Sequence, residues 1–153
     1  MPAPDSPFKH GEADASPGFL LWKITALWQR RLAQLLGEFG ITQTQYAIIA
    51  SLRWFEQQHE PPTQAHLVEH AKIDKMTLSK AIRKLEDDGL LLREPSPDDS
   101  RAFSIRFTPK GRKLVQQAVV AIEHADDQFF SVLGERQLAD YKALTKRLIS
   151  GNE

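Results

Sequence analysis

The nine prolines of this 153-residue chain are clustered, and their positions limit where long helices can form. Four prolines lie in residues 1–17, two form the pair Pro61–Pro62, and three lie between residues 95 and 109. Because proline breaks the interior of a helix, helices are expected in the stretches between these clusters. The proline-free stretches are 18–60, 63–94 and 110–153.

The first and last of these stretches have the pattern of long amphipathic helices, with apolar residues recurring at spacings of three and four. We predict helices over about 18–38 and 109–150, the second of them interrupted near Gly134. The apolar stripes of 110–133 and 136–150 are too wide for one face of an isolated small domain, so a dimer interface is an interpretation beside an intramolecular core. Residues 1–17 are polar and aperiodic and are predicted to form an N-terminal arm outside a single domain over 18–153.

The middle of the chain predicts a helix–turn–helix. Thr42 and Gln45 have the spacing of a capping box, which begins a helix that ends before Pro61. A short helix is expected over 63–71 and, after a tight break, a second helix over 74–88. This second helix has apolar residues on one face and small polar and basic residues elsewhere, which suits the major groove of DNA. The alternative is an ordinary α-hairpin with a solvated, charged face.

Residues 90–94 and 102–107 flank a turn-rich segment and are predicted to pair as a two-stranded β-hairpin. In the second strand Phe103, Ile105 and Phe107 alternate with polar residues, a period of two. A two-stranded ribbon is marginal alone in water, but beside a helix–turn–helix it becomes a wing. The tip of the hairpin is interpreted as a DNA contact, with an ordinary surface turn as the alternative. The predicted fold is mainly α with a small β-hairpin, a winged helix-turn-helix flanked by long helices.

Three segments carry a specific combination of motifs. They are ITQTQYAII (41–49), IDKMTLSKAIRKLEDDGLLLRE (73–94) and PDDSRAFSIRFTPKG (97–111). In these segments the chain resembles the MarR family, bacterial winged-helix transcriptional regulators named for multiple antibiotic resistance. The strong match covers 41–113 and a looser helical match covers about 18–150. The resemblance implies a homodimer whose winged helix-turn-helix spans about 42–108 and whose long terminal helices dimerise.

The resemblance also implies which residues contact DNA. Each winged helix of the dimer would bind half of a pseudo-palindromic site, with helix 74–88 in the major groove and the 95–101 wing in the minor groove. The candidate contacts on the helix are Lys75, Thr77, Ser79, Lys80, Arg83 and Lys84. At the wing Arg101 would enter the minor groove, where negative potential attracts arginine, and Asp99 would brace it. Ser100 departs from the basic residue that many members have between them.

The formal net charge is zero, because 20 basic residues balance 20 acidic ones, and alone this would discourage a nucleic-acid function. The balance is uneven along the chain. Residues 72–84 hold five basic residues against one acidic residue, and residues 100–113 hold five basic residues and no acidic one. The remaining residues therefore sum to −9. Such local excesses attract phosphate at short range. The acidic remainder should reduce non-specific binding, which favours a discriminating DNA-binding protein over a general DNA coat.

The string HLVEH at 66–70 has two histidines four residues apart with a glutamate between them, as in one class of zinc peptidases. The predicted helix is short, Leu67 is needed in the core, and no third ligand follows in a recognisable place. His66 and His70 are therefore interpreted as surface residues of the helix-turn-helix, with a zinc hydrolase or a regulatory metal site as alternatives. The sequence predicts no enzyme, no cofactor and no metal site.

Aromatic residues are frequent on the first two predicted helices, and regulators of the resembling family often bind small aromatic or phenolic effectors near that region. Apolar pockets with a few polar groups suit such ligands. The candidate ligand-binding residues are Trp22, Trp28, Arg31, Tyr46 and Trp54. Most of these rings can equally belong to the core or to the dimer interface.

Cysteine is absent, which excludes disulfides, thiolate metal sites and thiol-based sensing. No 18-residue apolar run and no secretory leader are recognisable, so we expect a cytoplasmic protein that does not associate with membranes. Double-stranded DNA and a second copy of the chain are the expected partners, together with a small aromatic effector. A winged helix that binds only proteins is the alternative function.

Overall fold

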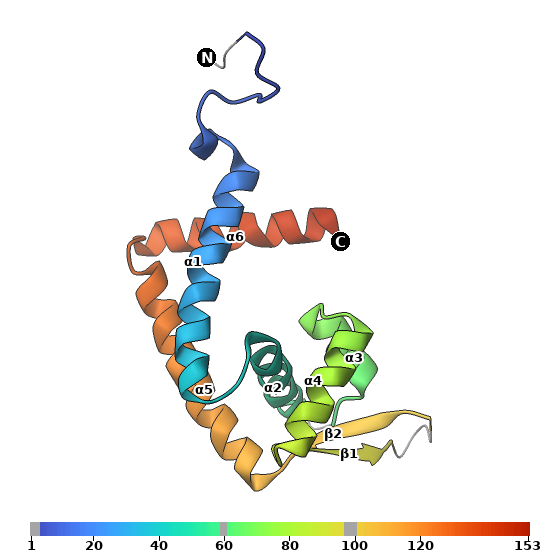
Figure 1. Cartoon of the computed structure of the whole chain (residues 1–153). Helices are drawn as coiled ribbons and strands as arrows, with labels where there is room; N and C mark the ends of the chain where they lie inside the picture. Colours follow the sequence, from blue (N-terminus) through green and yellow to red (C-terminus); the bar gives the residue numbers. More distant parts are fainter. Residues whose placement is uncertain (1–3, 59–60, 97–100) are drawn as a thin grey trace.

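A computed structural model describes residues 4–58, 61–96 and 101–153 and places a winged helix below a pair of long helices (Figure 1). The elements are the 3-10 turn η1 (Ala13–Ala15), the helices α1 (Pro17–Glu38), α2 (Gln43–Glu56), α3 (Gln64–Ala71), α4 (Lys75–Asp87), α5 (Pro109–Phe130) and α6 (Glu135–Asn152), and the strands β1 (Leu91–Pro95) and β2 (Phe103–Phe107). Helices α1 and α5 lie side by side, α6 crosses them, and α2, α3, α4 and the hairpin cluster together at the lower end. This is the mainly α, winged helix-turn-helix architecture that the sequence predicts.

Side chains placed at the helix starts explain where the helices begin. Ser16 accepts from the backbone N–H of Phe19 ahead of Pro17, and Thr108 accepts from that of Gly111 ahead of Pro109. A proline in the first helical position needs no hydrogen bond, so cap and proline act together. The capping box predicted at the start of α2 is also present. No helix among the described residues is long and apolar enough to span a membrane.

The core lies between α2, α3, α4, the hairpin and the lower halves of α1 and α5. Its large, fully buried side chains include Leu36, Ile48, Ile49, Leu52, Leu67, Leu78, Ile82, Leu85, Leu91, Ile105 and Val115. Among the described residues of α1 only Leu36 is buried, and α6 buries none. The two terminal helices therefore contribute little to the core of one chain, although both are rich in apolar residues.

The hairpin corrects one detail of the predicted alternation. Ile105 and Phe107 are buried as expected, but Phe103 is 43% exposed and Ser104 only 4% exposed. Phe103 pairs with Pro95 at the far end of the hairpin, beyond the core, where its ring lies 5.3 Å from the Arg93 guanidinium. Ser104 is buried because the segment before α3 packs on β2. Ser104 forms an isolated β-bridge with Thr63, and the backbone N–H of Ile105 donates to the Pro62 carbonyl at 3.1 Å.

The joint between the wing and α5 depends on a close backbone approach at Gly111. A Cβ built on Gly111 would lie 1.9 Å from the Leu90 carbonyl oxygen, so only glycine fits there. The same carbonyl accepts from the backbone N–H of Thr108 at 3.1 Å, and the Thr108 hydroxyl donates to the Gly89 carbonyl at 2.6 Å. The end of α4 and the start of α5 are thereby held against each other.

We expect Gly111→Ala to lower the free energy of unfolding by about 1–3 kcal/mol, because the added methyl meets backbone that can move only if the joint opens. Gly37→Ala is the matched control: Gly37 lies in α1, and a Cβ added there would meet no atom within 4 Å, so alanine should be neutral or stabilising. Urea unfolding of both variants at equal protein concentration measures the difference. Equal stability of the two variants would contradict the role given to the joint.

Candidate nucleic-acid interface

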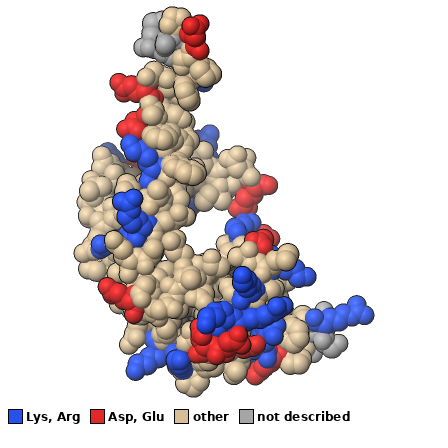
Figure 2. All heavy atoms as spheres, viewed as in Figure 1, with Lys and Arg blue, Asp and Glu red and all other residues tan. Residues whose placement is uncertain are grey.

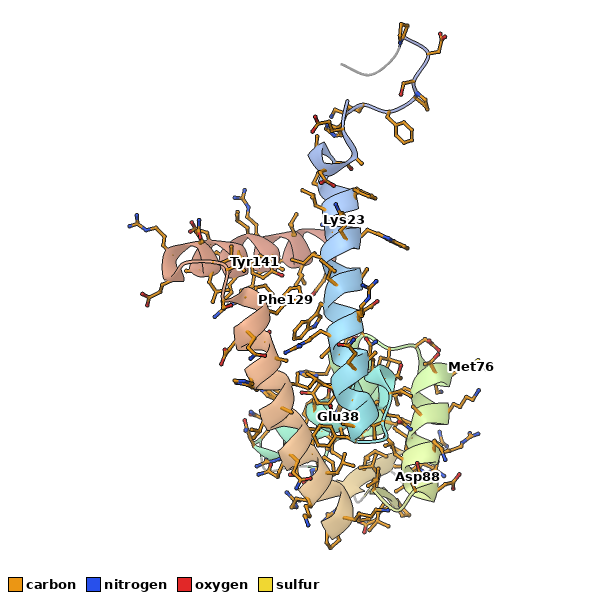
Figure 3. The ribbon with its side chains drawn as sticks, turned by 60° about the vertical axis from the view of Figure 1, so that its left-hand side comes forward. Lys23, Glu38, Met76, Asp88, Phe129 and Tyr141 are labelled. Carbon is orange, nitrogen blue, oxygen red and sulfur yellow. The ribbon has the colours of Figure 1, made fainter. Side chains whose placement is uncertain are left out.

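Helix α4 is anchored by one face and presents the other to solvent. Leu78, Ile82 and Leu85 are fully buried against α2, α3 and β1. Asp74 caps the helix, accepting from the Thr77 backbone N–H at 2.9 Å, and Gly89 (φ 75°) follows its end. In Figure 3 the side chains of α4 between the labelled Met76 and Asp88 point outward from the body of the protein. The helix is therefore held rigidly while its outer face stays accessible.

Lysine and arginine gather on this outer face and beside the wing (Figure 2). Lys75, Lys80 and Arg83 are exposed, and none of them forms an ion pair or a side-chain hydrogen bond with another described residue. Lys84 is exposed but pairs with Asp88 at 3.0 Å. Three cations of α4 thus remain available for an anionic partner.

Thr77 and Ser79, also predicted as contacts, make bonds within the protein. The hydroxyl and the backbone N–H of Thr77 both donate to Asp74, and these bonds lower the pKa of that carboxyl below its usual value. The Ser79 hydroxyl accepts from the side-chain amide of Gln64, the first residue of α3. Gln64 was not among the predicted site residues, because nothing in sequence spacing shows that the start of α3 touches α4.

The wing stands beside the start of α4. Arg101, Phe103 and Lys75 line a hollow of about 400 Å³ together with Gln64 and neighbouring residues at the start of α3. The two basic residues therefore border one concave surface between α4 and the wing. Asp99, the predicted brace of Arg101, lies outside the described residues.

Two of the five basic residues in the second basic segment pair with acidic residues. Arg112 donates two hydrogen bonds to Glu56, at 2.6 and 2.8 Å, which raise the pKa of its guanidinium. Arg106 pairs with Glu94 at 3.2 Å across the two strands. The local excess of positive charge expected over 100–113 is therefore reduced by acidic residues from elsewhere in the chain.

His66 and His70 have structural roles in the described part of the chain. His66 Nδ1 accepts from the backbone N–H of Thr63 at 3.1 Å and completes the cap of α3. His70 lies 3.0 Å from the Ser51 hydroxyl and stacks on Trp54 with ring centroids 5.1 Å apart. Among the described residues no group of three potential ligands could hold a metal ion.

The five candidate ligand-binding residues are not brought together. Trp28 lies on α1 and lines a hollow of about 680 Å³ with Phe129 of α5 and Tyr141 of α6. Phe129 and Tyr141 are labelled in Figure 3. Arg31 donates to the Gln128 side chain at 2.6 Å, and Trp22 is 74% exposed beside a separate hollow.

Tyr46 and Trp54 lie on α2, away from Trp28. Tyr46 is half-buried against the core, and burial together with the charge of Glu123 raises its pKa to about 12. Trp54 instead packs on His70 and Phe55 at the side of α3. Of the five candidates, only Trp28 lines the hollow between the terminal helices.

A helix–turn–helix followed by a hairpin that borders its second helix defines a winged helix-turn-helix protein. The sequence model of the MarR family matches residues 41–103. The HTH-type transcriptional regulator YdcH of Bacillus subtilis is 31% identical over 129 residues, which cover 84% of this chain and 88% of that protein. An HTH-type transcriptional repressor of Mycobacterium tuberculosis is 27% identical over 90% of this chain and 97% of its own length. The chain belongs to the MarR family and is a transcriptional regulator, not an enzyme.

Solved structures have the same fold. The chain is similar to MepR of S. aureus in its DNA complex, with a TM-score of 0.82, 23% identity, and coverage of 93% of this chain and 100% of that one. A probable transcriptional regulator from Pseudomonas aeruginosa has a TM-score of 0.74 and 25% identity, with coverage of 90% and 99%. The arrangement of the terminal helices around a winged helix is therefore that of known MarR-type structures.

Proposed function

We propose that this regulator is a cytoplasmic homodimer that binds a pseudo-palindromic operator, with α4 in the major groove and the 95–101 wing in the minor groove of each half-site. The observation that carries the proposal is the outer face of α4, where Lys75, Lys80 and Arg83 are exposed and make no ion pair with another described residue. A cation that is already paired with a carboxylate attracts a phosphate group less strongly. These three cations can instead bind DNA phosphates and release the counterions condensed on them.

The geometry of the helix–turn–helix supports this proposal. The major groove is about 12 Å wide and admits one helix, and α4 is held by a single buried face. Arg101 borders the same concave surface as Lys75, so a groove-bound α4 would bring the wing toward the neighbouring phosphates or minor groove. MepR of S. aureus and a MarR mutant from E. coli, both similar in fold, were solved with DNA. Half-sites would lie about one helical turn, 34–36 Å, apart.

The terminal helices supply the surface for a second copy. Large apolar side chains are exposed on α1 and α6, in a chain whose core lies elsewhere. They are Phe19, Leu20, Leu21, Trp22 and Leu27 on α1, and Tyr141, Leu144, Leu148 and Ile149 on α6. An exposed apolar surface of this extent is typical of an interface, and α1 and α6 cross each other so that both contribute to it (Figure 1).

A double substitution of Leu144 and Leu148 by aspartate should therefore convert the dimer to a monomer, because it would bury two charges per chain. Light scattering after size-exclusion chromatography measures the mass. The control is Leu92→Asp on β1, also an exposed leucine but distant from the terminal helices, which should leave the dimer intact. A dimer that survives the double substitution would contradict the proposed interface.

DNA binding is tested on the fragment upstream of the protein's own gene, by fluorescence anisotropy at several salt concentrations. We expect steep salt dependence in the native protein. Lys80→Ala should weaken binding on every sequence and reduce the slope of log affinity against log salt by about one. Arg101→Ala should weaken binding through the wing. Lys146→Ala, an exposed lysine on α6, is the matched control and should bind like the native protein.

Two outcomes would contradict the DNA-binding proposal. Equal affinity for the upstream fragment and for random DNA would contradict sequence-specific regulation. Unchanged affinity in both Lys80→Ala and Arg101→Ala would favour a winged helix that contacts proteins instead.

A small aromatic or phenolic ligand would weaken operator binding if it bound preferentially to a dimer in which the distance between the two α4 helices does not match the half-site spacing. The hollow beside Trp28 has the volume and the aromatic lining for such a ligand. Benzoate or phenol should then quench tryptophan fluorescence and weaken operator binding, with both effects reduced in Trp28→Phe. Trp54→Phe is the control, because Trp54 lies outside this hollow. An unchanged response in Trp28→Phe would place any effector elsewhere.

A further inference from the structure

Met76 is the one large apolar side chain on the outer face of α4. It lies in the first turn of the helix and is 84% exposed, although methionine is a residue that proteins usually bury. In Figure 3 it marks the upper, outer end of α4. Within the described residues it makes no contact that would account for an apolar group in this position.

The position of Met76 around the helix is specific. Met76, Lys80 and Arg83 are spaced four and three residues apart, so they form one stripe along α4. The buried residues Leu78 and Ile82 lie on the opposite side of the helix. The centre of the outer face is therefore occupied by an unbranched apolar chain near the N-terminus, followed by two cations.

From this placement we propose that Met76 contacts the C5-methyl group of a thymine in each operator half-site and selects for that base. The inference rests on the proposed DNA-binding function and adds the base that is recognised. When α4 lies in the major groove, the N-terminal residues of the helix contact base edges. The thymine methyl is the only apolar group that a base pair presents there, and it sets thymine apart from the other bases.

The side-chain chemistry along the stripe favours different roles for Met76 and for the two cations. Lys80 and Arg83 can bind phosphate or guanine, but neither distinguishes thymine by its methyl group. Methionine has no hydrogen-bonding group of comparable strength, so a preference made by Met76 depends on burying apolar surface. Its flexible thioether can adjust to a methyl group whose position varies with local DNA shape.

The first experiment selects preferred sequences from random double-stranded DNA with the native protein and then replaces each selected thymine, one position per half-site, by uracil. Uracil lacks only the methyl group and keeps the base pair. At one thymine per half-site the replacement should weaken binding about fourfold for each half-site, the effect of one buried methyl group. Replacement at the other positions should have little effect.

Two variants connect this loss to Met76. Met76→Ala should bind the thymine and uracil forms equally, whereas Met76→Leu should retain the preference because leucine is also apolar. Both substitutions are at an exposed position, so both proteins should fold, and circular dichroism with size-exclusion chromatography verifies this. Salt dependence should remain that of the native protein in both, because no cation is removed.

Oxidation of the Met76 thioether provides a chemical variant of the same side chain. Hydrogen peroxide transfers one oxygen atom to Met76 Sδ: the O–O bond breaks, an S–O bond forms, and water is the other product. The sulfoxide is polar, so the oxidised protein should no longer prefer the thymine form over the uracil form. The chain has no cysteine and only one other methionine, Met1, so Met76→Leu treated with the same peroxide is a matched control that should keep its preference.

The outcomes separate the inference from the function on which it rests. If the native protein selects no sequence, the DNA-binding proposal itself fails. If it selects sequences but binds thymine and uracil forms equally at every position, the role of Met76 is wrong. A thymine preference that persists in Met76→Ala assigns the methyl contact to another residue and also overturns the inference.

Discussion

The orientation of α4 depends on three buried side chains, Leu78, Ile82 and Leu85, packed against α2, α3 and the first strand. Truncating one such residue to alanine typically costs about 2–5 kcal/mol, a large share of the stability of a small domain. Because these three residues fix the rotation of α4 about its own axis, they also decide which residues face solvent. The exposed stripe on the outer face of α4, for which we propose DNA contacts, is a geometric consequence of the core.

The same constraint extends to the wing. Leu90 and Leu91 continue directly from α4 into the core, and the Leu90 carbonyl meets the start of α5 at Gly111. Rotation of α4 would therefore strain the joint with α5, and α5 packs along α1. A change in how two copies of α1, α5 and α6 associate would be transmitted to α4 as a movement of the whole winged helix. This rigid coupling is what a ligand-dependent change in half-site spacing would require.

Most of the fold could be predicted from the sequence because its signals are local. Capping side chains, proline positions and apolar spacing act within a few residues. They predict the cap at Thr42 and helices that begin near residues 63, 74 and 109, where the structure has them. The exposure of Phe103 could not be predicted, because it depends on where the hairpin leaves the core.

The candidate site was predictable in part, for the same reason. The exposed cations of α4 follow from helical periodicity, and so does the stripe that contains Met76, although an apolar residue was not expected on it. The bond between Gln64 and Ser79 depends on the angle between α3 and α4, which no spacing encodes. The five candidate ligand-binding residues lie apart within one chain because residue type does not show which neighbour a helix faces: Trp22, Trp28 and Trp54 border different surfaces, and the ligand site stays a prediction.

The net charge of zero conceals two different uses of basic residues. Arg93, Arg106 and Arg112 each pair with a glutamate and brace the hairpin and the base of α5. Lys75, Lys80 and Arg83 make no such pair with an acidic residue in the part of the chain that the structure describes, so their positive charge is not neutralised by those residues. Partially exposed ion pairs contribute little stability, about 0–1 kcal/mol each, but a paired arginine also attracts phosphate less strongly. The glutamates that pair with these arginines lie on α2, on the wing and near the end of α4, so unpaired positive charge remains on the outer face of α4, where we propose that bases are distinguished.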